Sequence, residues 1–180
     1  MKTVTYGELC DIFKNEGINP DDLQTLLVKR LTQLGKTAAT AESCTGGLIS
    51  KRITEVSGAS AVFGLGVCSY ANEIKERVLG VRRETLDSVG AVSPETAEQM
   101  ACGVMRLARS DLGVSTTGIA GPTGGTAEKP VGLVYICACC ESSREVIKAT
   151  LGDMPSPSRE KIRKAASDAA LYMLLKAAES

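Results

Sequence analysis

The sequence predicts an α/β fold, a three-layer α/β/α sandwich around a mixed, mostly parallel sheet. Helix patterns alternate along the chain with apolar stretches that have the length of strands. Two glycine-rich turns each follow one of these stretches, and two late strands are joined by a short turn. At 180 residues and 18.8 kDa the chain has the usual size of one domain. We therefore expect a single domain over residues 1–180, with residues 1–20 as a variable N-terminal extension.

The first helix of this pattern is expected to begin at Asn19-Pro20, where an N-cap residue precedes a proline, and to end near Gly35. Residues 37–42 then predict a strand that runs into the turn 43–47 and a following helix. Residues 62–70 form an apolar run broken by glycines, which is typical of a buried strand with close backbone neighbours. This order predicts a strand, a tight turn, a helix and a second strand.

The middle of the chain continues the alternation. A helix is predicted over residues 71–79, and another begins at Ser93-Pro94-Glu95, which combines a cap, a proline and an acid. Residues 112–117 predict a short strand that enters a loop rich in glycine and proline, residues 118–125. Both glycine-rich segments therefore follow strands.

The last third of the chain predicts a hairpin and a helix. Residues 131–139 and 144–150 look like two strands joined by a turn, and we expect them to pair antiparallel. Ser158 is expected to cap the last helix, which runs to about Ala178. Ligands of such folds bind at the carboxyl ends of the strands, so we look there for a site.

Composition narrows the possible functions. Lys plus Arg and Asp plus Glu both number 21, so the net charge is zero and nucleic acid is not an expected partner. The seven cysteines are an odd set without the spacing of a disulfide framework, which favours a reducing compartment. No apolar run reaches the ~18 residues that a membrane span needs. We expect a cytoplasmic protein with no membrane partner.

The absence of histidine is the most informative feature of the composition. It removes the usual general base, the commonest metal ligand and every arrangement that pairs a nucleophile with imidazole. A hydrolase built from this sequence needs a lysine of lowered pKa, a carboxylate or a tyrosinate as its base. We expect no metal and no cofactor.

Ser43 lies where a predicted strand turns into a helix. There the amides of Thr45, Gly46 and Gly47 are expected to be unpaired, ready to hold an oxyanion or a phosphate. Ser43 is either a nucleophile or simply the cap of the helix, and the local sequence does not decide between the two. We expect the neighbouring Cys44 to be a buried small residue rather than a rival nucleophile.

Lys75 lies on the first turns of the helix that follows the strand over residues 62–70. A lysine on a helix is usually solvated, and the polar residues around this one look like an ordinary surface. If Lys75 were desolvated beside Ser43, however, its pKa would fall, and the neutral amine would take the serine proton.

Two further segments are candidates for holding a ligand. Residues 115–126 combine hydroxyls and glycines after a strand, which suits a phosphate or ribose but is equally typical of a flexible surface loop. Arg159 and Arg163 lie one turn apart at the start of the last helix, where one is expected to bind a phosphate. The residues alone do not choose between these arginines.

Four blocks of the sequence, in order, resemble the signatures of the CinA C-terminal domain family. They are residues 41–47 (AESCTGG), 69–75 with 79–81 (SYANEIK, LGV), 90–93 (GAVS) and 117–122 (TGIAGP). The resemblance covers about residues 23–174. It implies a nicotinamide-nucleotide amidohydrolase that acts without a metal and converts nicotinamide mononucleotide to nicotinic acid mononucleotide and ammonia, in pyridine nucleotide salvage.

The resemblance also implies roles for single residues. Ser43 would be the nucleophile, Lys75 its base, and Tyr70 a helper in positioning or proton transfer. The residues expected to contact substrate are Thr45, Gly46, Gly47, Thr117, Gly118, Gly121, Arg159 and Arg163. In the family a Gly-Asp-Arg element precedes the last helix, whereas here residues 154–158 separate Gly152-Asp153 from Arg159. We favour Arg159 for the phosphate and keep Arg163 as the alternate.

Other interpretations stay open at this stage. The chain is alternatively a non-catalytic nucleotide-binding module, a protein of interactions tied to competence or DNA damage, or an amidase of another carboxamide nucleotide. Larger relatives carry an N-terminal domain resembling molybdopterin-binding proteins, and we expect none here. The expected partners are a small nucleotide substrate and a second copy of the chain, since relatives suggest a homodimer and the alanine-rich last helix is suited to pack on itself.

Overall fold

The structure is a computed structural model and describes residues 1–179. Its strands are β1 (Lys2–Thr5), β2 (Ala38–Glu42), β3 (Phe63–Cys68), β4 (Leu112–Gly118), β5 (Leu133–Cys140) and β6 (Arg144–Thr150). Its α-helices are α1 (Tyr6–Asn15), α2 (Leu23–Leu34), α3 (Leu48–Thr54), α4 (Asn72–Leu79), α5 (Arg83–Ser88), α6 (Pro94–Ala108) and α7 (Arg159–Ala178). Short 3-10 helices are η1 (Pro20–Asp22), η2 (Ala59–Ala61) and η3 (Leu151–Asp153).

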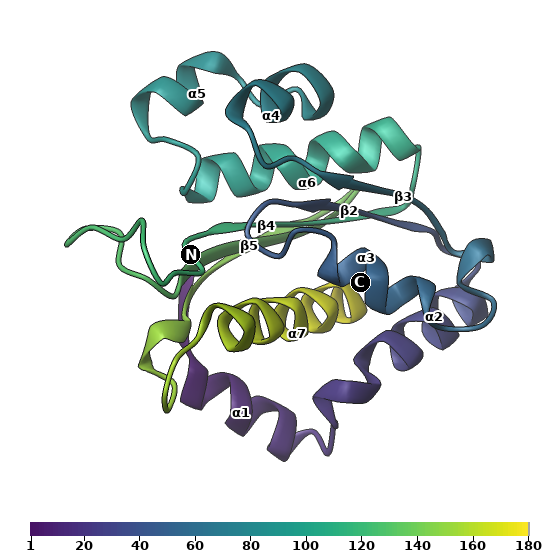
Figure 1. The fold of residues 1–180 in the computed structure, drawn as a ribbon. Coiled ribbons are helices and arrows are strands. Elements are labelled where there is room, and N and C mark those ends of the chain that lie inside the picture. Colours follow the sequence, from purple (N-terminus) through teal and green to yellow (C-terminus); the bar gives the residue numbers. More distant parts are fainter. Residues whose placement is uncertain (180) are drawn as a thin grey trace.

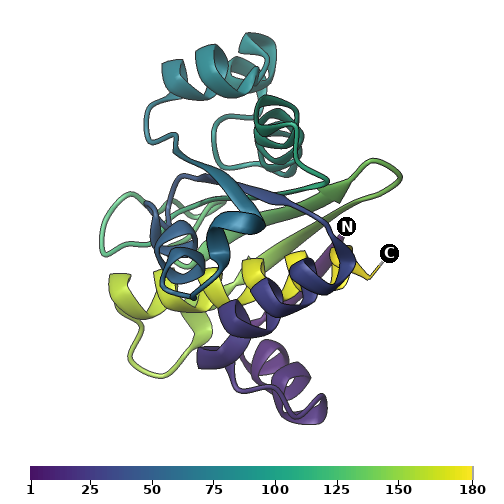
Figure 2. The ribbon, with the colours of Figure 1, turned by 90° about the vertical axis from the view of Figure 1, so that its right-hand side faces the viewer.

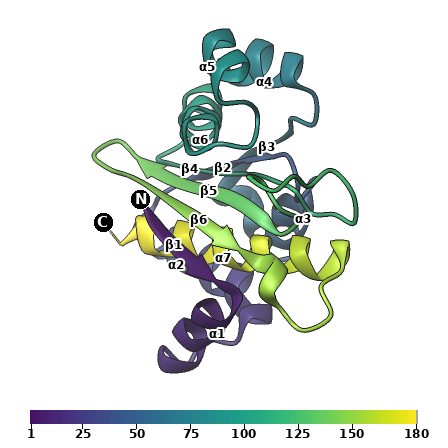
Figure 3. The same ribbon diagram turned by 90° about the vertical axis from the view of Figure 1, so that its left-hand side faces the viewer.

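One mixed sheet of six strands forms the centre of the molecule, in the order β1-β6-β5-β4-β2-β3. The pairs β1–β6, β2–β4 and β2–β3 are parallel, whereas β4–β5 and β5–β6 are antiparallel. The predicted hairpin is therefore present as β5 and β6, and the predicted mixed, mostly parallel sheet is confirmed. Figure 3 shows β1 lying along β6 at one edge of this sheet.

Helices cover both faces of the sheet (Figure 1). The helices α4, α5 and α6 lie on one face, and α7, α3, α2 and α1 lie on the other. The last helix is buried on most of its surface, because its alanines pack inside the core. We expected α7 to pack against a second copy of itself, but most of this helix already lies between the sheet and its neighbouring helices, and association of two copies stays a prediction. Within residues 1–179 no helix is both long and apolar enough to cross a bilayer.

The helix boundaries follow from the capping residues. The Ser93 side chain accepts a hydrogen bond from the Thr96 amide at the start of α6, and the Ser158 side chain accepts one from the Lys161 amide at the start of α7. Gly35 ends α2 in the left-handed conformation, which glycine adopts without strain. These three boundaries agree with the predicted ones.

Two parts of the fold were not predicted. Residues 2–15 form β1 and α1, and a capping box between Thr5 and Glu8 joins them. This segment is part of the sheet rather than a mere extension, and a four-residue strand carries too little pattern to be seen in sequence. The short helix α5 was also missed.

The strand β3 lies at a different place in the sheet from the one we predicted. We expected a buried strand, but β3 lies at the edge of the sheet and pairs only with β2 (Figure 2). Its residues alternate between exposed and half-buried. The predicted close approach is correct, because a side-chain carbon at Gly66 would collide with Ser50 on α3.

Candidate functional site

The carboxyl ends of three parallel strands meet at one edge of the sheet. Glu42 at the end of β2 is in register with Cys68 of β3 and Thr116 of β4. Two backbone hydrogen bonds extend the ladder: Ser43 N donates to Thr116 O at 3.0 Å, and Ser69 N donates to Glu42 O at 2.8 Å. The segments after these strands therefore lie side by side, at the place where α/β folds bind their ligands.

Ser43 and Lys75 meet at this edge. Lys75 lies on the first turn of α4, and helical side chains lean back toward the helix N-terminus. Its Nζ is 3.1 Å from Ser43 Oγ. Ser43 does not cap α3, because that helix begins at Leu48 with Gly47 as its N-cap residue. The interpretation of Ser43 as a helix cap is therefore wrong.

Lys75 is buried, with 1% of its surface exposed. Its Nζ also donates to the carbonyl of Ser69 at 2.6 Å and to that of Tyr70 at 3.4 Å. Burial lowers the pKa of Lys75, because the charged amine loses its hydration. In its neutral form the amine would keep two N–H bonds for these carbonyls and would turn its lone pair toward Ser43 Oγ. The geometry thus suits proton transfer from Ser43 to Lys75.

The turn between β2 and α3 offers backbone donors beside Ser43. Gly46 and Gly47 both have positive φ, 59° and 90°, which glycine adopts at no steric cost. In the part of the chain that the structure describes, the amides of Thr45, Gly46 and Gly47 have no hydrogen-bond partner. Free amides of this kind bind a phosphate or a developing oxyanion.

Glu42 is a site residue that the sequence interpretation missed. It is fully buried, and its carboxylate accepts hydrogen bonds from the amides of Ile49 and Ser50 at 3.0 and 2.8 Å and from the Ser50 hydroxyl at 2.7 Å. Glu42 thereby satisfies the first-turn donors of α3, which leaves the Ser43 hydroxyl for Lys75. The available signal was a carboxylate at the end of a predicted strand.

Tyr70 and Arg159 lie next to each other at the rim of the site. Tyr70 is 69% exposed, and its hydroxyl accepts a hydrogen bond from an Arg159 amine nitrogen at 3.2 Å. The other amine nitrogen of Arg159 donates to the Gly121 carbonyl at 3.0 Å. Arg159 is exposed, so its guanidinium is accessible from solvent. The structure thus joins the loop after β4, the segment after β3 and α7.

Arg163 is placed differently from Arg159. Its Nε and one amine nitrogen both donate to the carbonyl of Thr45, at 3.2 and 2.5 Å. The Thr45 hydroxyl is bonded to that of Thr116 at 2.7 Å, inside the protein. Both arginines thus donate to backbone carbonyls, Arg159 to that of Gly121 and Arg163 to that of Thr45.

Two residues predicted to contact substrate have other roles in the structure. Thr117 is 1% exposed, and its hydroxyl donates to the Ala91 carbonyl at 2.6 Å. Gly118 packs its backbone against Leu133 and Val134 of β5, where a side chain would collide. Both hold the end of β4 in place, and their direct contact with substrate stays a prediction.

The cysteines and the metal prediction can be compared with the structure directly. Cys44 is buried, as expected, and burial raises its pKa to about 12. Cys137 and Cys139 are also buried and pack with Cys102 in the core. Among residues 1–179 no three side chains of Cys, Asp and Glu gather in a way that would hold a metal ion.

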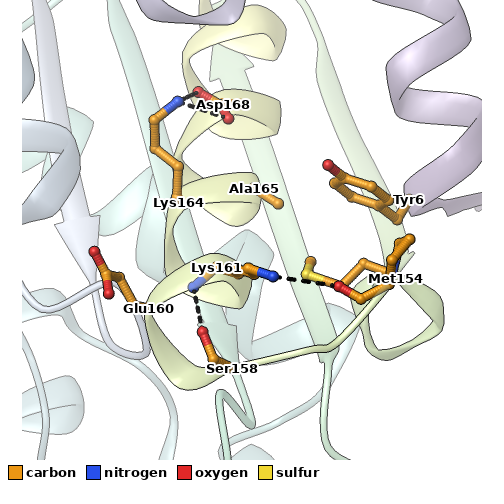
Figure 4. Close-up of a pocket in the computed structure, with 9 residues that line it drawn as sticks. Tyr6, Met154, Ser158, Glu160, Lys161, Lys164, Ala165 and Asp168 are labelled. Atoms are coloured by element: carbon orange, nitrogen blue, oxygen red, sulfur yellow. Dashed lines mark hydrogen bonds and ion pairs between the residues drawn. The ribbon is translucent and has the colours of Figure 1, made fainter.

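A separate hollow of about 600 Å³, whose lining does not include Ser43, lies beside the start of α7 (Figure 4). Tyr6, Met154 and Ala165 provide its apolar lining, and Lys161 and Lys164 lie at its side. Both lysines are already bonded, Lys161 to backbone carbonyls and Lys164 to carboxylates. The residues that resemble family signatures lie at the strand ends instead.

Fold and site together define a class: a three-layer α/β protein with a buried lysine, a serine and free backbone amides at the carboxyl edge of a mixed sheet. The family model of the CinA C-terminal domain matches residues 20–178. The chain belongs to this family.

Relatives and solved structures agree with this assignment. The chain is 48% identical over 168 residues to a CinA-like protein of Desulfovibrio desulfuricans and 47% identical over 161 residues to one of Kosmotoga olearia. These alignments cover 93% and 89% of the chain but 39% and 38% of the relatives, so the chain spans well under half their length. The crystal structure of the competence/damage inducible protein CihA from Agrobacterium tumefaciens superposes with a TM-score of 0.84 at 43% identity, covering 88% of this chain and 94% of that one.

Proposed function

We propose that this chain is an amidohydrolase that converts nicotinamide mononucleotide to nicotinic acid mononucleotide and ammonia. The observation that carries the proposal is the buried amine of Lys75, 3.1 Å from Ser43 Oγ and beside a turn with free amides. This geometry supports the reaction class, because an activated serine with oxyanion donors is suited to acyl transfer. The choice of substrate rests on the resemblance to the family.

The first half of the reaction forms an acyl-enzyme. Neutral Lys75 takes the proton of Ser43 as its Oγ attacks the carboxamide carbon, and the carbonyl oxygen becomes an oxyanion. Amides of the turn over residues 45–47 hold that oxyanion. Lys75, now protonated, gives its proton to the leaving nitrogen as the C–N bond breaks, and ammonia departs. Lys75 is neutral again.

The second half releases the acid. Lys75 accepts a proton from a water molecule, whose oxygen attacks the acyl carbon and forms a second oxyanion in the same turn. The bond to Ser43 Oγ breaks, the proton returns to that oxygen, and the carboxylic acid product leaves. Arg159 and the loop after β4 bind the phosphate at a distance, which orients the carboxamide at Ser43.

The direct test is an ammonia assay with nicotinamide mononucleotide. Ser43→Ala and Lys75→Ala are expected to abolish ammonia release while the fold is kept. Lys51→Ala is the matched control, since this lysine lies exposed on α3 in an ion pair with Glu55. Near-normal turnover in either site variant contradicts the proposal. Thermal stabilisation by the nucleotide without ammonia release favours a binding module instead.

We also propose that two copies associate through β3. Within residues 1–179 this strand pairs only with β2, which leaves its outer backbone edge unpaired. Gly64 and Gly66 on it are exposed, and no charged residue occurs between Glu55 and Glu73. Monomeric proteins avoid long uncharged edge strands of this kind, because such edges pair with strands of other molecules. Antiparallel pairing of β3 with its own copy satisfies both edges at once.

The oligomeric state is measured by light scattering after gel filtration. The native chain is expected at twice 18.8 kDa. Gly64→Lys places a charge on the edge, where the structure has open space, and is expected to give a single chain. Gly64→Ala, without the charge, is the control and stays paired. A native mass of one chain, or an unchanged mass for Gly64→Lys, contradicts this surface.

A further inference from the structure

Arg163 holds the turn that carries the free amides. Two of its nitrogen atoms donate to one carbonyl, that of Thr45, at 3.2 and 2.5 Å. The amide of Leu48 donates to the same oxygen at 3.3 Å. On the other side, the Thr45 hydroxyl is bonded to the Thr116 hydroxyl of β4 at 2.7 Å. Thr45 is therefore fixed through its side chain and its carbonyl together.

This clamp sets the direction of the next amide. In a trans peptide the C=O and the following N–H point in opposite directions. Since the carbonyl of Thr45 points at Arg163, the amide of Gly46 points away from it. Gly46 has a positive φ of 59° and is exposed, and glycine at such a position is otherwise free to move. Arg163 supplies the restraint that glycine lacks.

A guanidinium on the carbonyl also changes the strength of the amide. Hydrogen bonds in a chain polarise one another, so a cation bound to the oxygen makes the N–H of the same peptide a stronger donor. Arg163 is half-buried, which reduces screening of this effect by water.

We propose that Arg163 is a positioning residue that orients and polarises the Gly46 amide as the oxyanion donor, acting through the Thr45 carbonyl rather than on the phosphate of the substrate. The inference rests on the proposed function. It also separates the two arginines, because Arg159 remains the group that faces solvent and the loop after β4.

The test combines turnover with a probe that needs no substrate. A fluorophosphonate labels an activated serine through an oxyanion-like transition state, and intact-mass spectrometry follows its attachment to Ser43. Arg163→Gln is expected to slow both labelling and kcat at least tenfold, a part of the roughly 100- to 1000-fold loss that removal of one oxyanion donor causes, with KM changed less than twofold. Arg159→Gln is expected to raise KM for the nucleotide and to leave labelling unchanged.

Further variants keep the outcome clear. Lys161→Gln, on the same helix turn, is the control and changes neither readout. Arg163→Lys keeps the charge but not the contact through two nitrogen atoms. Its labelling rate and kcat are expected to lie between those of the native chain and Arg163→Gln, and it replaces the glutamine variant if that variant unfolds. Guanidinium ion added to Arg163→Ala is expected to restore part of the labelling rate. Absence of labelling in the native chain refutes the proposed function, whereas labelling at the native rate in Arg163→Gln refutes the role of Arg163.

Discussion

The ion pair between Arg52 on α3 and Asp168 on α7 is expected to control the stability of the site's scaffold. The two groups are 2.7 Å apart and almost fully buried. Arg52 also donates to the Ser167 hydroxyl, the Pro20 carbonyl and the Gln24 side chain. Asp168→Asn removes the charge that balances this guanidinium and leaves a cation in the core without a counter-charge.

The magnitude follows from these contacts. Breaking a buried pair by removing one partner costs about 3–5 kcal/mol. Asparagine keeps one oxygen acceptor and Arg52 keeps its other acceptors, so we take the lower value, about 3 kcal/mol. In a domain of this size each kcal/mol lowers Tm by about 2–4 °C, which gives a fall of about 6–12 °C. Thermal unfolding followed by circular dichroism measures it.

The matched control is Asp21→Asn. Asp21 bonds to Lys164 at 2.9 Å, but its side chain is 75% exposed, so the expected loss is below about 1 kcal/mol. Lys164 also binds Asp168, as Figure 4 shows, and therefore keeps a partner in this variant. An Asp168→Asn variant that unfolds within 2 °C of the native chain, a threshold of about 1 kcal/mol, refutes the reasoning. Equal effects of the two substitutions refute it as well.

Three other predictions concern the site and its surroundings. Because burial lowers the pKa of Lys75, kcat/KM is expected to rise with pH to a plateau whose midpoint lies below the ordinary lysine value of about 10.4, and a flat profile contradicts this. Between the lowered pKa of Lys75 in the folded chain and its ordinary pKa in the unfolded chain, the unfolded chain binds one more proton. The free energy of unfolding, measured in urea, is therefore expected to rise with pH in the native chain and not in Lys75→Met. Glu42→Gln removes a carboxylate that accepts three hydrogen bonds, so it is expected to lower the free energy of unfolding by about 1.5–3 kcal/mol and to reduce turnover. An unchanged midpoint of urea unfolding contradicts this prediction. The hydroxyls of Ser142 and Ser143 lower the pKa of Cys140 to about 7, so iodoacetamide is expected to modify Cys140 long before Cys44, and equal rates by mass spectrometry contradict this.

The fold was largely predictable because its signals are local. Caps and prolines at Ser93 and Ser158 mark helix starts, and alternating helix and strand lengths indicate the layers. The position of a strand within the sheet is not local: an apolar run such as residues 63–68 suits the centre or the edge equally well. The strand β1 was missed for a related reason, since its pairing with β6 joins residues more than 140 positions apart.

The site was predictable in its main residues but not in its supports. The turn after β2 and the lysine after β3 are recognisable because each follows a strand end. The hydrogen bonds between Glu42 and the first turn of α3 depend on the path of the turn after β2. The bond from Arg163 to the Thr45 carbonyl depends on where α7 passes this turn. The bond from the Thr117 hydroxyl to the Ala91 carbonyl could not be foreseen either, because in sequence a hydroxyl after a strand looks the same whether it faces a ligand or a backbone carbonyl.

The two buried cations among residues 1–179 have different partners, and the difference supports the proposed role of Lys75 as a base. Arg52 is balanced by the carboxylate of Asp168, as a structural cation in a core needs to be. Lys75 is buried at least as deeply, yet its partners are neutral oxygens of Ser43, Ser69 and Tyr70, and within residues 1–179 it forms no ion pair. A carboxylate in their place would hold the proton on the amine and remove its basicity. Neutral partners keep the amine in position and allow it to lose that proton, which a base requires and a structural lysine does not.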